Sequence, residues 1–281
     1  MNIVHEVFSL SGICFLSLKN PFPCVTITTI ITDTGIERRD SMYQFESRVR
    51  YSEVDSERHL TLPAVMDYLQ DCCTFQSEDM DIGVEYLAEQ KQAWVLSSWE
   101  IKIRRYPVMG EKICVETWPY AFKGFYGYRN FRITNGQGEE LVLANSVWVY
   151  MDMERMRPMR IPEKVADAYR PEIGEELPGE WGARKLSVPE SGTAMPPVPV
   201  AGFFIDTNHH MNNGKYILVA KESVPEDFAI GGVRAEYRRA AMLGDVLHPV
   251  VTVSEEKITV VLTDGGDQIY AIVEFAAVEK N

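Results

Sequence analysis

Cysteine is scarce in this chain. Its 281 residues include five Cys, an odd number. Cys14 and Cys24 lie in the N-terminal stretch, whereas Cys72, Cys73 and Cys114 lie in apolar helix or strand patterns, where a free Cys behaves mostly as a small hydrophobe. Because the Cys count is odd and no targeting signal is recognisable, we expect a protein of the reducing cytoplasm.

Basic residues are also few. The 28 Lys and Arg are outnumbered by 41 Asp and Glu, which gives a net charge of −13. Nucleic acids are bound through Lys and Arg side chains that neutralise phosphates. The charge balance therefore argues against a nucleic-acid-binding function.

Long hydrophobic runs are missing. The N-terminal stretch has apolar patches, but Lys19, Asn20 and two Pro interrupt any run of the ~20 residues that a membrane-spanning helix needs. Glu6 stands where a signal peptide would carry basic residues. Met42 directly precedes the first clear strand pattern. We therefore expect no membrane span, and we expect residues 1–41 to be an extension outside the fold, either disordered or the product of a misassigned start site.

The rest of the chain contains a diverged internal repeat. One matched pair of segments keeps an Asp-x-x-x-His string, with Asp55 and His59 corresponding to Asp206 and His210. A second pair matches RRYPVMGE with RRAAMLGD. The aligned segments are 51–66 with 202–217, and 104–111 with 238–245. Self-similarity of this kind indicates two copies of one structural plan.

Each repeat shows the same order of elements, which is a strand, a helix with one apolar face, and then several β-rich runs separated by turn residues. The first repeat has a strand at 43–51, a helix at 62–75 and strands at 94–106, 112–120, 124–134 and 140–151. The second has a strand at 198–205, a helix at 212–223 and strands at 232–239, 246–254, 257–263 and 268–277. This order predicts an α+β fold in which an antiparallel sheet wraps around a central helix.

Residues 153–197 separate the repeats. They are rich in Pro, Gly and charge, which favours an extended crossing segment over a packed one, with one short helix near 162–169. The expected organisation is an N-terminal domain at 42–152, this linker, and a C-terminal domain at 198–281. Two such domains have ample core for a lined tunnel. Five large side chains could line it, although each is more readily explained as core: Met66, Leu69, Phe75, Trp94 and Trp99.

The string DTNHHMNNGKYI at 206–217 is the most informative motif. In an extended segment side chains alternate between two faces, so Asp206, Asn208 and His210 would share one side, and His209 would face the other. The helix that follows would direct its unpaired N–H groups toward them. A base that titrates near neutrality, an amide and a positive helix end are suited to attack on a carbonyl group.

Together, these motifs resemble those of a known protein family. The tandem repeats, the 206–217 string and the Glu236-Tyr237-Arg238-Arg239 segment resemble the acyl-acyl carrier protein thioesterase family of plant plastids and bacteria, over about residues 42–278. The resemblance implies a pair of fused hotdog domains that hydrolyse fatty acyl thioesters of acyl carrier protein. It places Asp206, Asn208 and His210 at the active site and gives the N-terminal domain the task of holding the acyl chain.

One departure from the family pattern bears on the mechanism. Plant members follow the Glu-Tyr-Arg-Arg segment with a Glu and a Cys, where this chain has Ala240 and Ala241. A covalent route needs a nucleophile beside the base. We therefore expect direct attack by water, with His210 as general base and N–H groups near Asn213 and Gly214 holding the oxyanion. Glu236 is open to two interpretations, a substitute acid or a structural strand residue.

The resemblance also implies an acidic partner, acyl carrier protein, for an acidic enzyme. A basic patch would relieve the repulsion, and Arg155, Arg157 and Arg160 are candidates for docking the carrier. We expect no metal and no cofactor, since the substrate itself carries phosphopantetheine, and a monomer or homodimer. Three alternatives stay open: hydrolysis of acyl-CoA, dehydration of hydroxyacyl carriers, and acyl binding without catalysis.

Overall fold

The structure is a computed structural model that describes residues 8–10, 13–15, 31–32, 42–254 and 256–278. It divides into two units, residues 1–41 and 42–281. In the first unit, short strands β1 (Phe8–Leu10), β2 (Ile13–Phe15) and β3 (Ile31–Thr32) form an antiparallel sheet. Most of residues 1–41, and with them the expectation of disorder or a misassigned start, lie outside the described residues. No helix in the described ranges is both long and apolar enough to cross a bilayer.

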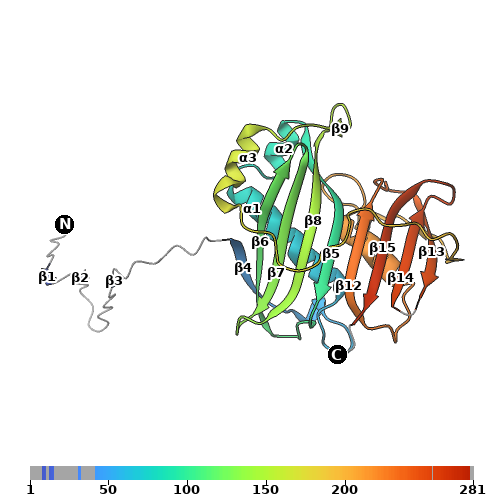
Figure 1. The fold of residues 1–281 in the computed structure, drawn as a ribbon, viewed down its shortest axis with the longest axis horizontal. Coiled ribbons are helices and arrows are strands. Elements are labelled where there is room, and N and C mark those ends of the chain that lie inside the picture. Colours follow the sequence, from blue (N-terminus) through green and yellow to red (C-terminus); the bar gives the residue numbers. More distant parts are fainter. Residues whose placement is uncertain (1–7, 11–12, 16–30, 33–41, 255, 279–281) are drawn as a thin grey trace. The chain divides into compact units, whose positions relative to one another are not determined.

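The second unit is built on one continuous antiparallel sheet (Figure 1). Its N-terminal half contains β4 (Tyr43–Arg48), β5 (Gln92–Ile103), β6 (Lys112–Lys123), β7 (Tyr126–Asn135) and β8 (Glu140–Asp152). Its C-terminal half contains β12 (Ile230–Tyr237), β13 (Val246–Val253), β14 (Lys257–Thr263) and β15 (Ile269–Ala277). The halves join where β5 pairs with β12. Short strands β9 (Arg157–Pro158), β10 (Thr193–Ala194) and β11 (Val198–Pro199) extend the sheet.

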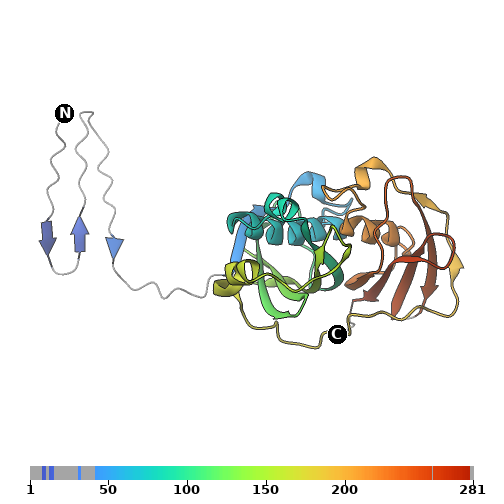
Figure 2. The same cartoon turned by 90° about the horizontal axis from the view of Figure 1, so that it is seen from above.

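Helices cover one face of this sheet (Figure 2). The two central helices are α1 (Leu62–Asp79) and α4 (Asn213–Lys221), which contact each other. Thr61 caps α1 and Asn212 caps α4, each by accepting an N–H two or three residues ahead. Their apolar faces are fully buried in a core that both halves share. Each half is therefore an antiparallel sheet wrapped around a helix, which confirms the predicted α+β fold of fused hotdog domains.

Two smaller helices lie at the N-terminal half. The helix α3 (Glu163–Tyr169) coincides with the short helix predicted near 162–169. The helix α2 (Val84–Glu89) has only six residues and was not predicted. Both helices pack around a small second core that includes Ile82, Tyr150 and Val165.

The repeat is visible in the turns as well as in the elements. Asp55 Oδ1 accepts the N–H of the residue two positions ahead, and Asp206 Oδ1 does the same. Each turn then contains a residue in the left-handed region, with φ of 68° at Arg58 and 63° at His209. The matched acids Glu111 and Asp245 likewise each accept the N–H three residues behind. The repeat therefore preserves these backbone turns, through an identical Asp at one position and an acidic residue of either kind at the other.

The linker between the halves is packed, which corrects the prediction of an unpacked segment. It crosses the face of the sheet opposite the helices (Figures 1 and 2). Trp118 Nε1 on β6 donates to the carbonyl of Glu175 at 2.8 Å, and the N–H of Leu186 donates to Glu236 Oε2 on β12 at 2.7 Å. These bonds tie an extended segment to both halves of the sheet.

The predicted strand at 198–205 is mostly wrong. Only Val198–Pro199 forms a strand, and a 3-10 turn at Gly202–Phe204 follows it. The equivalent 3-10 turn at Tyr51–Glu53 follows β4 in the first half. Phe204, which is buried in the core, therefore belongs to a turn and not to a strand.

We expect the Arg105–Glu111 pair to make stability depend on pH. Arg105 donates two hydrogen bonds to Glu111, at 3.0 and 2.8 Å, and these bonds lower the pKa of Glu111 below its usual value of 4.5. A group whose pKa is lowered by folding stabilises the protein above its unfolded pKa and loses that contribution as the pH falls through its folded pKa. Glu111→Gln should therefore lower Tm at pH 7, and the difference from wild type should shrink below about pH 4.5. Thermal melts across that range would measure it, and a constant difference would contradict the pair's role.

Candidate active site

The segment that carries the candidate catalytic residues is a tight turn, which corrects the extended segment predicted from the sequence. Asp206 N donates to the carbonyl of His210 at 3.0 Å, and His209 N donates to the carbonyl of Asp206 at 3.0 Å. Asp206 Oδ1 accepts the N–H of Asn208 at 2.8 Å. The alternation argument therefore does not apply here, because the backbone reverses direction between residues 206 and 210.

The turn nevertheless brings Asp206, Asn208 and His210 to one cavity of about 740 Å³. His210 is 24% exposed, and its Nδ1 is buried 3.7 Å from Asp206 Oδ1, with no hydrogen-bond partner among the described residues. Since Nδ1 is buried, the exposed part of the imidazole must include other ring atoms. His209 does not line this cavity.

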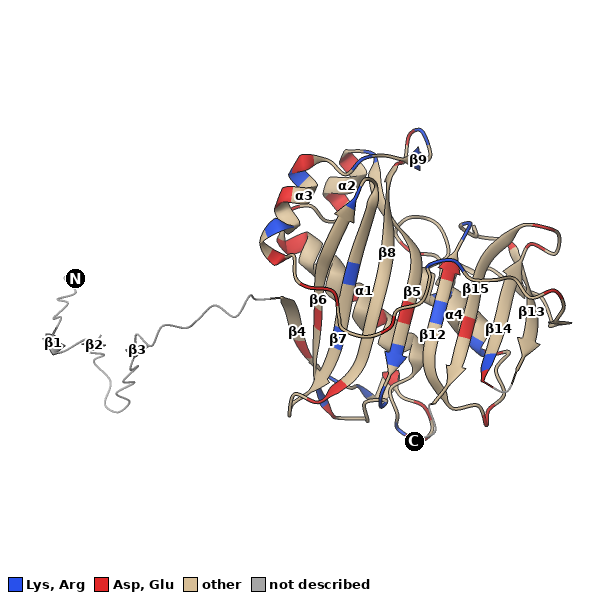
Figure 3. Cartoon of the chain, viewed as in Figure 1, with Lys and Arg blue, Asp and Glu red and all other residues tan. Residues whose placement is uncertain are grey.

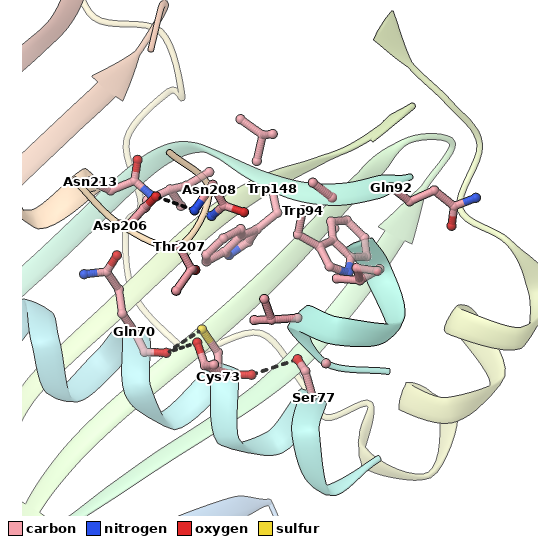
Figure 4. Close-up of a pocket in the computed structure, with 18 of the residues that line it drawn as sticks. Gln70, Cys73, Ser77, Gln92, Trp94, Trp148, Asp206, Thr207, Asn208 and Asn213 are labelled. Atoms are coloured by element: carbon pink, nitrogen blue, oxygen red, sulfur yellow. Dashed lines mark hydrogen bonds between the residues drawn. The ribbon is translucent and has the colours of Figure 1, made fainter. Parts of the chain in front are cut away.

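The cavity draws its walls from both halves of the second unit (Figure 4). Asp206, Thr207, Asn208 and Asn213 approach from the C-terminal half, across from α1. The N-terminal half supplies most of the wall, with one aromatic residue from each of the strands β5, β6, β7 and β8: Trp94, Phe122, Tyr128 and Trp148. The volume falls in the range of about 300–1,000 Å³ that is typical of ligand sites.

Of the five large side chains considered from the sequence, only Trp94 lines the cavity. Met66, Leu69 and Trp99 are at most 2% exposed within the shared core, and Phe75 is largely exposed. Phe122 and Trp148 were not anticipated. Both strands contain long buried stretches, so the sequence alone did not distinguish side chains of the cavity wall from those of the core.

The two predicted oxyanion donors, the N–H groups of Asn213 and Gly214, lie in the first turn of α4. Asn213 lines the cavity, and its N–H, as the first of the helix, has no partner within the helix. Gly214 does not line the cavity, and its N–H donates to the capping Asn212 Oδ1 at 2.9 Å. The expectation for Gly214 is therefore wrong, since its N–H is already bonded.

Ala240 and Ala241, which stand where plant members of the family have Glu and Cys, lie beside the turn at residues 206–210. Ala240 is exposed, whereas Ala241 is fully buried, and its carbonyl accepts the N–H of Met211 at 2.8 Å. Neither residue lines the cavity. Glu236 is 5% exposed and bonds to the linker and to Arg238, so the structure supports its structural interpretation.

Cys73 on α1 contributes the one thiol among the described residues that line the cavity. Burial raises the pKa of the Cys73 thiol above its usual value of 9.0. A thiol held in its protonated form is a poor nucleophile. The site therefore favours an activated water over a covalent route through Cys73.

The polar face of α1 was missed in the sequence. Gln70, Asp71, Thr74 and Ser77 line the cavity together with Cys73. Residues spaced by three or four positions share one face of a helix, and Gln70, Thr74 and Ser77 have that spacing. This polar stripe beside the apolar face of α1 was the available signal.

The three candidate docking residues lie around the turn that joins β8 to β9, with Arg155 in the turn, Arg157 on β9 and Arg160 just after β9. Arg155, Arg157 and Arg160 are all exposed. Met153 and Glu154, which precede them, line the cavity. Figure 3 shows basic residues at this turn beside acidic residues on α2 and α3. Arg155 already pairs with Asp152 at 3.1 Å, so Arg157 and Arg160 are the more available cations.

Comparisons with known proteins agree with this architecture. Residues 40–169 match the acyl-ACP thioesterase N-terminal domain, and residues 192–273 match the C-terminal domain of the same family. A solved acyl-ACP thioesterase from Bacteroides thetaiotaomicron has 24% identity, with a TM-score of 0.75 over 83% of this chain and 96% of that one. The 12:0-ACP thioesterase from Umbellularia californica has 23% identity and a TM-score of 0.75, over 85% and 98%.

Curated relatives include plant enzymes. The chloroplastic palmitoyl-acyl carrier protein thioesterase of Gossypium hirsutum is 26% identical over 74% of this chain and 54% of its own length. The chloroplastic dodecanoyl-[acyl-carrier-protein] hydrolase of Cinnamomum camphora is 28% identical over 73% and 58%. The chain spans about half to two thirds of the length of the curated relatives it matches. Both family domains, in order and over most of the folded unit, show that the chain belongs to the acyl-ACP thioesterase family.

Proposed function

We propose that this protein hydrolyses the thioester of fatty acyl-acyl carrier protein and releases the free fatty acid. The observation that carries the proposal is the cavity, which extends along the aromatic wall of the N-terminal half and meets Asp206, Asn208 and His210 of the C-terminal half. The part along the aromatic wall would hold the acyl chain, and the part beside Asp206, Asn208 and His210 would hold the thioester. Relatives named as acyl-carrier-protein hydrolases support the same substrate class.

The proposed chemistry needs only water as co-substrate, with no metal or cofactor. His210 takes a proton from a water molecule, and the oxygen of that water attacks the carbonyl carbon of the thioester. The resulting oxyanion is held by the N–H of Asn213 at the positive end of α4. The tetrahedral intermediate then breaks its carbon–sulfur bond, and the imidazolium returns the proton to the departing thiolate. The products are a carboxylic acid and the free thiol of phosphopantetheine.

Asn208 and Asp206 have supporting roles in this scheme. Asn208 is exposed to the cavity, and we assign its side-chain amide to the positioning of the water or the carbonyl group. Asp206 fixes the turn, because its Oδ1 already accepts the N–H of Asn208. The carboxylate also lies close to His210 Nδ1, where it would stabilise the imidazolium.

The proposed partner is acyl carrier protein, docked at the β8–β9 turn beside the cavity. Replacing both Arg157 and Arg160 with Glu should raise KM for a carrier-linked substrate by about 10-fold, because charge complementarity steers association. KM for the matching acyl-CoA should hardly change. The control is the double replacement of Arg58 and Lys221, two exposed cations outside the cavity wall, with Glu, which changes the net charge equally. Equal effects on both substrates would contradict docking at this turn.

The proposed function is tested directly by the release of free thiol. The protein should be incubated with acyl-carrier and acyl-CoA thioesters of short to long chain length. We expect hydrolysis with a higher kcat/KM for the carrier-linked series. Preference for acyl-CoA would favour the alternative hydrolase, and binding without thiol release would favour an acyl-binding protein. Cytoplasmic location and a monomeric or homodimeric state stay predictions.

A further inference from the structure

One residue of the cavity comes from the N-terminal half and yet lies beside the candidate reaction centre. Gln70 on α1 lines the cavity opposite Asp206, Asn208 and Asn213 (Figure 4). Its main-chain carbonyl accepts bonds from Cys73 Sγ and Thr74 Oγ1. Its side-chain amide, in contrast, has no hydrogen-bond partner within residues 42–254 and 256–278. A free amide in a partly enclosed site is available to a ligand.

The amide of Gln70 lies against the first turn of α4. A Cβ placed on Gly214 would lie 3.4 Å from Gln70 Nε2 and 3.3 Å from Asn212 Oδ1, so a side chain at position 214 would crowd both groups. Glycine therefore lets Gln70 approach the helix start closely. This is the end of α4 where unpaired N–H groups create a positive potential.

We propose that Gln70 is a catalytic residue contributed by the N-terminal half, whose Nε2 donates a hydrogen bond to the thioester oxygen as it becomes an oxyanion. This assignment rests on the proposed thioester hydrolysis. Gly214 cannot serve as a donor, because its N–H is bonded to Asn212. The oxyanion therefore needs a donor besides the N–H of Asn213. Gln70 Nε2 lies beside that helix turn, and its amide is a neutral hydrogen-bond donor.

This role predicts a specific kinetic signature. A donor that acts mainly on the transition state lowers kcat when it is removed and leaves KM little changed. A residue that only holds the acyl chain or the phosphopantetheine arm would instead raise KM. The two roles are therefore separated by steady-state kinetics on one substrate.

The test uses the full chain and a long-chain acyl-carrier thioester. Gln70→Met keeps the length of the side chain and removes the donor, and it should lower kcat by about 100-fold, with KM within about 3-fold of wild type. Gln70→Glu keeps the shape and places a negative charge beside the oxyanion, so its kcat should be lower still. Asp67→Asn, at an exposed position one turn earlier on α1 and outside the cavity wall, should keep near-normal kcat. Melting curves would identify which variants fold. One folded Gln70 variant is enough for the test.

The outcomes separate the two proposals. An active wild type with a folded Gln70→Met variant of near-normal kcat would overturn the assignment of Gln70 and leave the proposed function intact. A raised KM at unchanged kcat would do the same. A wild type that releases no thiol from any acyl thioester would overturn the proposed function, and the role of Gln70 with it.

Discussion

Replacing His210 with Ala is expected to lower kcat for an acyl-carrier thioester by about 1,000-fold, because a positioned general base contributes on the order of 100- to 10,000-fold. The imidazole lines the cavity and is 24% exposed, and its Nδ1 bonds to none of the described residues. Its removal therefore leaves no hydrogen-bonded partner unsatisfied in the fold. We expect Tm to change little, and KM to stay close to its wild-type value.

The neighbouring histidine offers a matched control. His209 lies in the same turn but outside the cavity wall, and its φ of 63° places it in the left-handed region. Asn tolerates that conformation better than Ala does, so His209→Asn should keep the turn and near-normal kcat. Similar loss of kcat in both variants would assign the effect to the turn and not to the base. Near-normal kcat for His210→Ala would exclude general-base catalysis by this residue.

The order of elements could be read from the sequence because each element repeats a short-range pattern. The helix predicted at 62–75 forms α1, and it runs four residues further because nothing in its sequence breaks the helix before Met80. The strands predicted at 112–120 and 257–263 form β6 and β14. The six-residue helix α2 was missed because it is too short to show a helical period.

Three residues of the candidate site could be named from the sequence, but their geometry could not. The string at 206–217 identified Asp206, Asn208 and His210, all of which line one cavity. The predicted extended segment was wrong, because the Asp206 side chain bonds to the backbone two residues ahead and closes a turn. Gln70 could not be assigned from its own half, since its position at the site depends on the packing of α1 against α4.

Replacing Asp206 with Ala is expected to lower kcat by about 500-fold. Displacing one reacting group by about 1 Å costs on the order of 100-fold, and the Asp206 carboxylate positions more than one group. It accepts the N–H of Asn208 at 2.8 Å and lies 3.7 Å from His210 Nδ1. Without it, the turn keeps its backbone bonds but loses the bond to Asn208, and the imidazolium loses its nearby negative charge.

The internal repeat supplies the control for this second prediction. Asp55 Oδ1 accepts the N–H of Glu57 at 3.0 Å and of His59 at 2.9 Å, so Asp55→Ala removes the same kind of turn in the half whose turn does not line the cavity. Each Asp→Ala change should lower stability by about 1 kcal/mol per hydrogen bond lost. Only Asp206→Ala should lower kcat, and Asp206→Asn should recover part of it, because an amide oxygen can still accept the N–H of Asn208. If Asp55→Ala lowered kcat as much, the loss would reflect stability shared by the whole fold, and Asp206 would have no specific role in positioning the site.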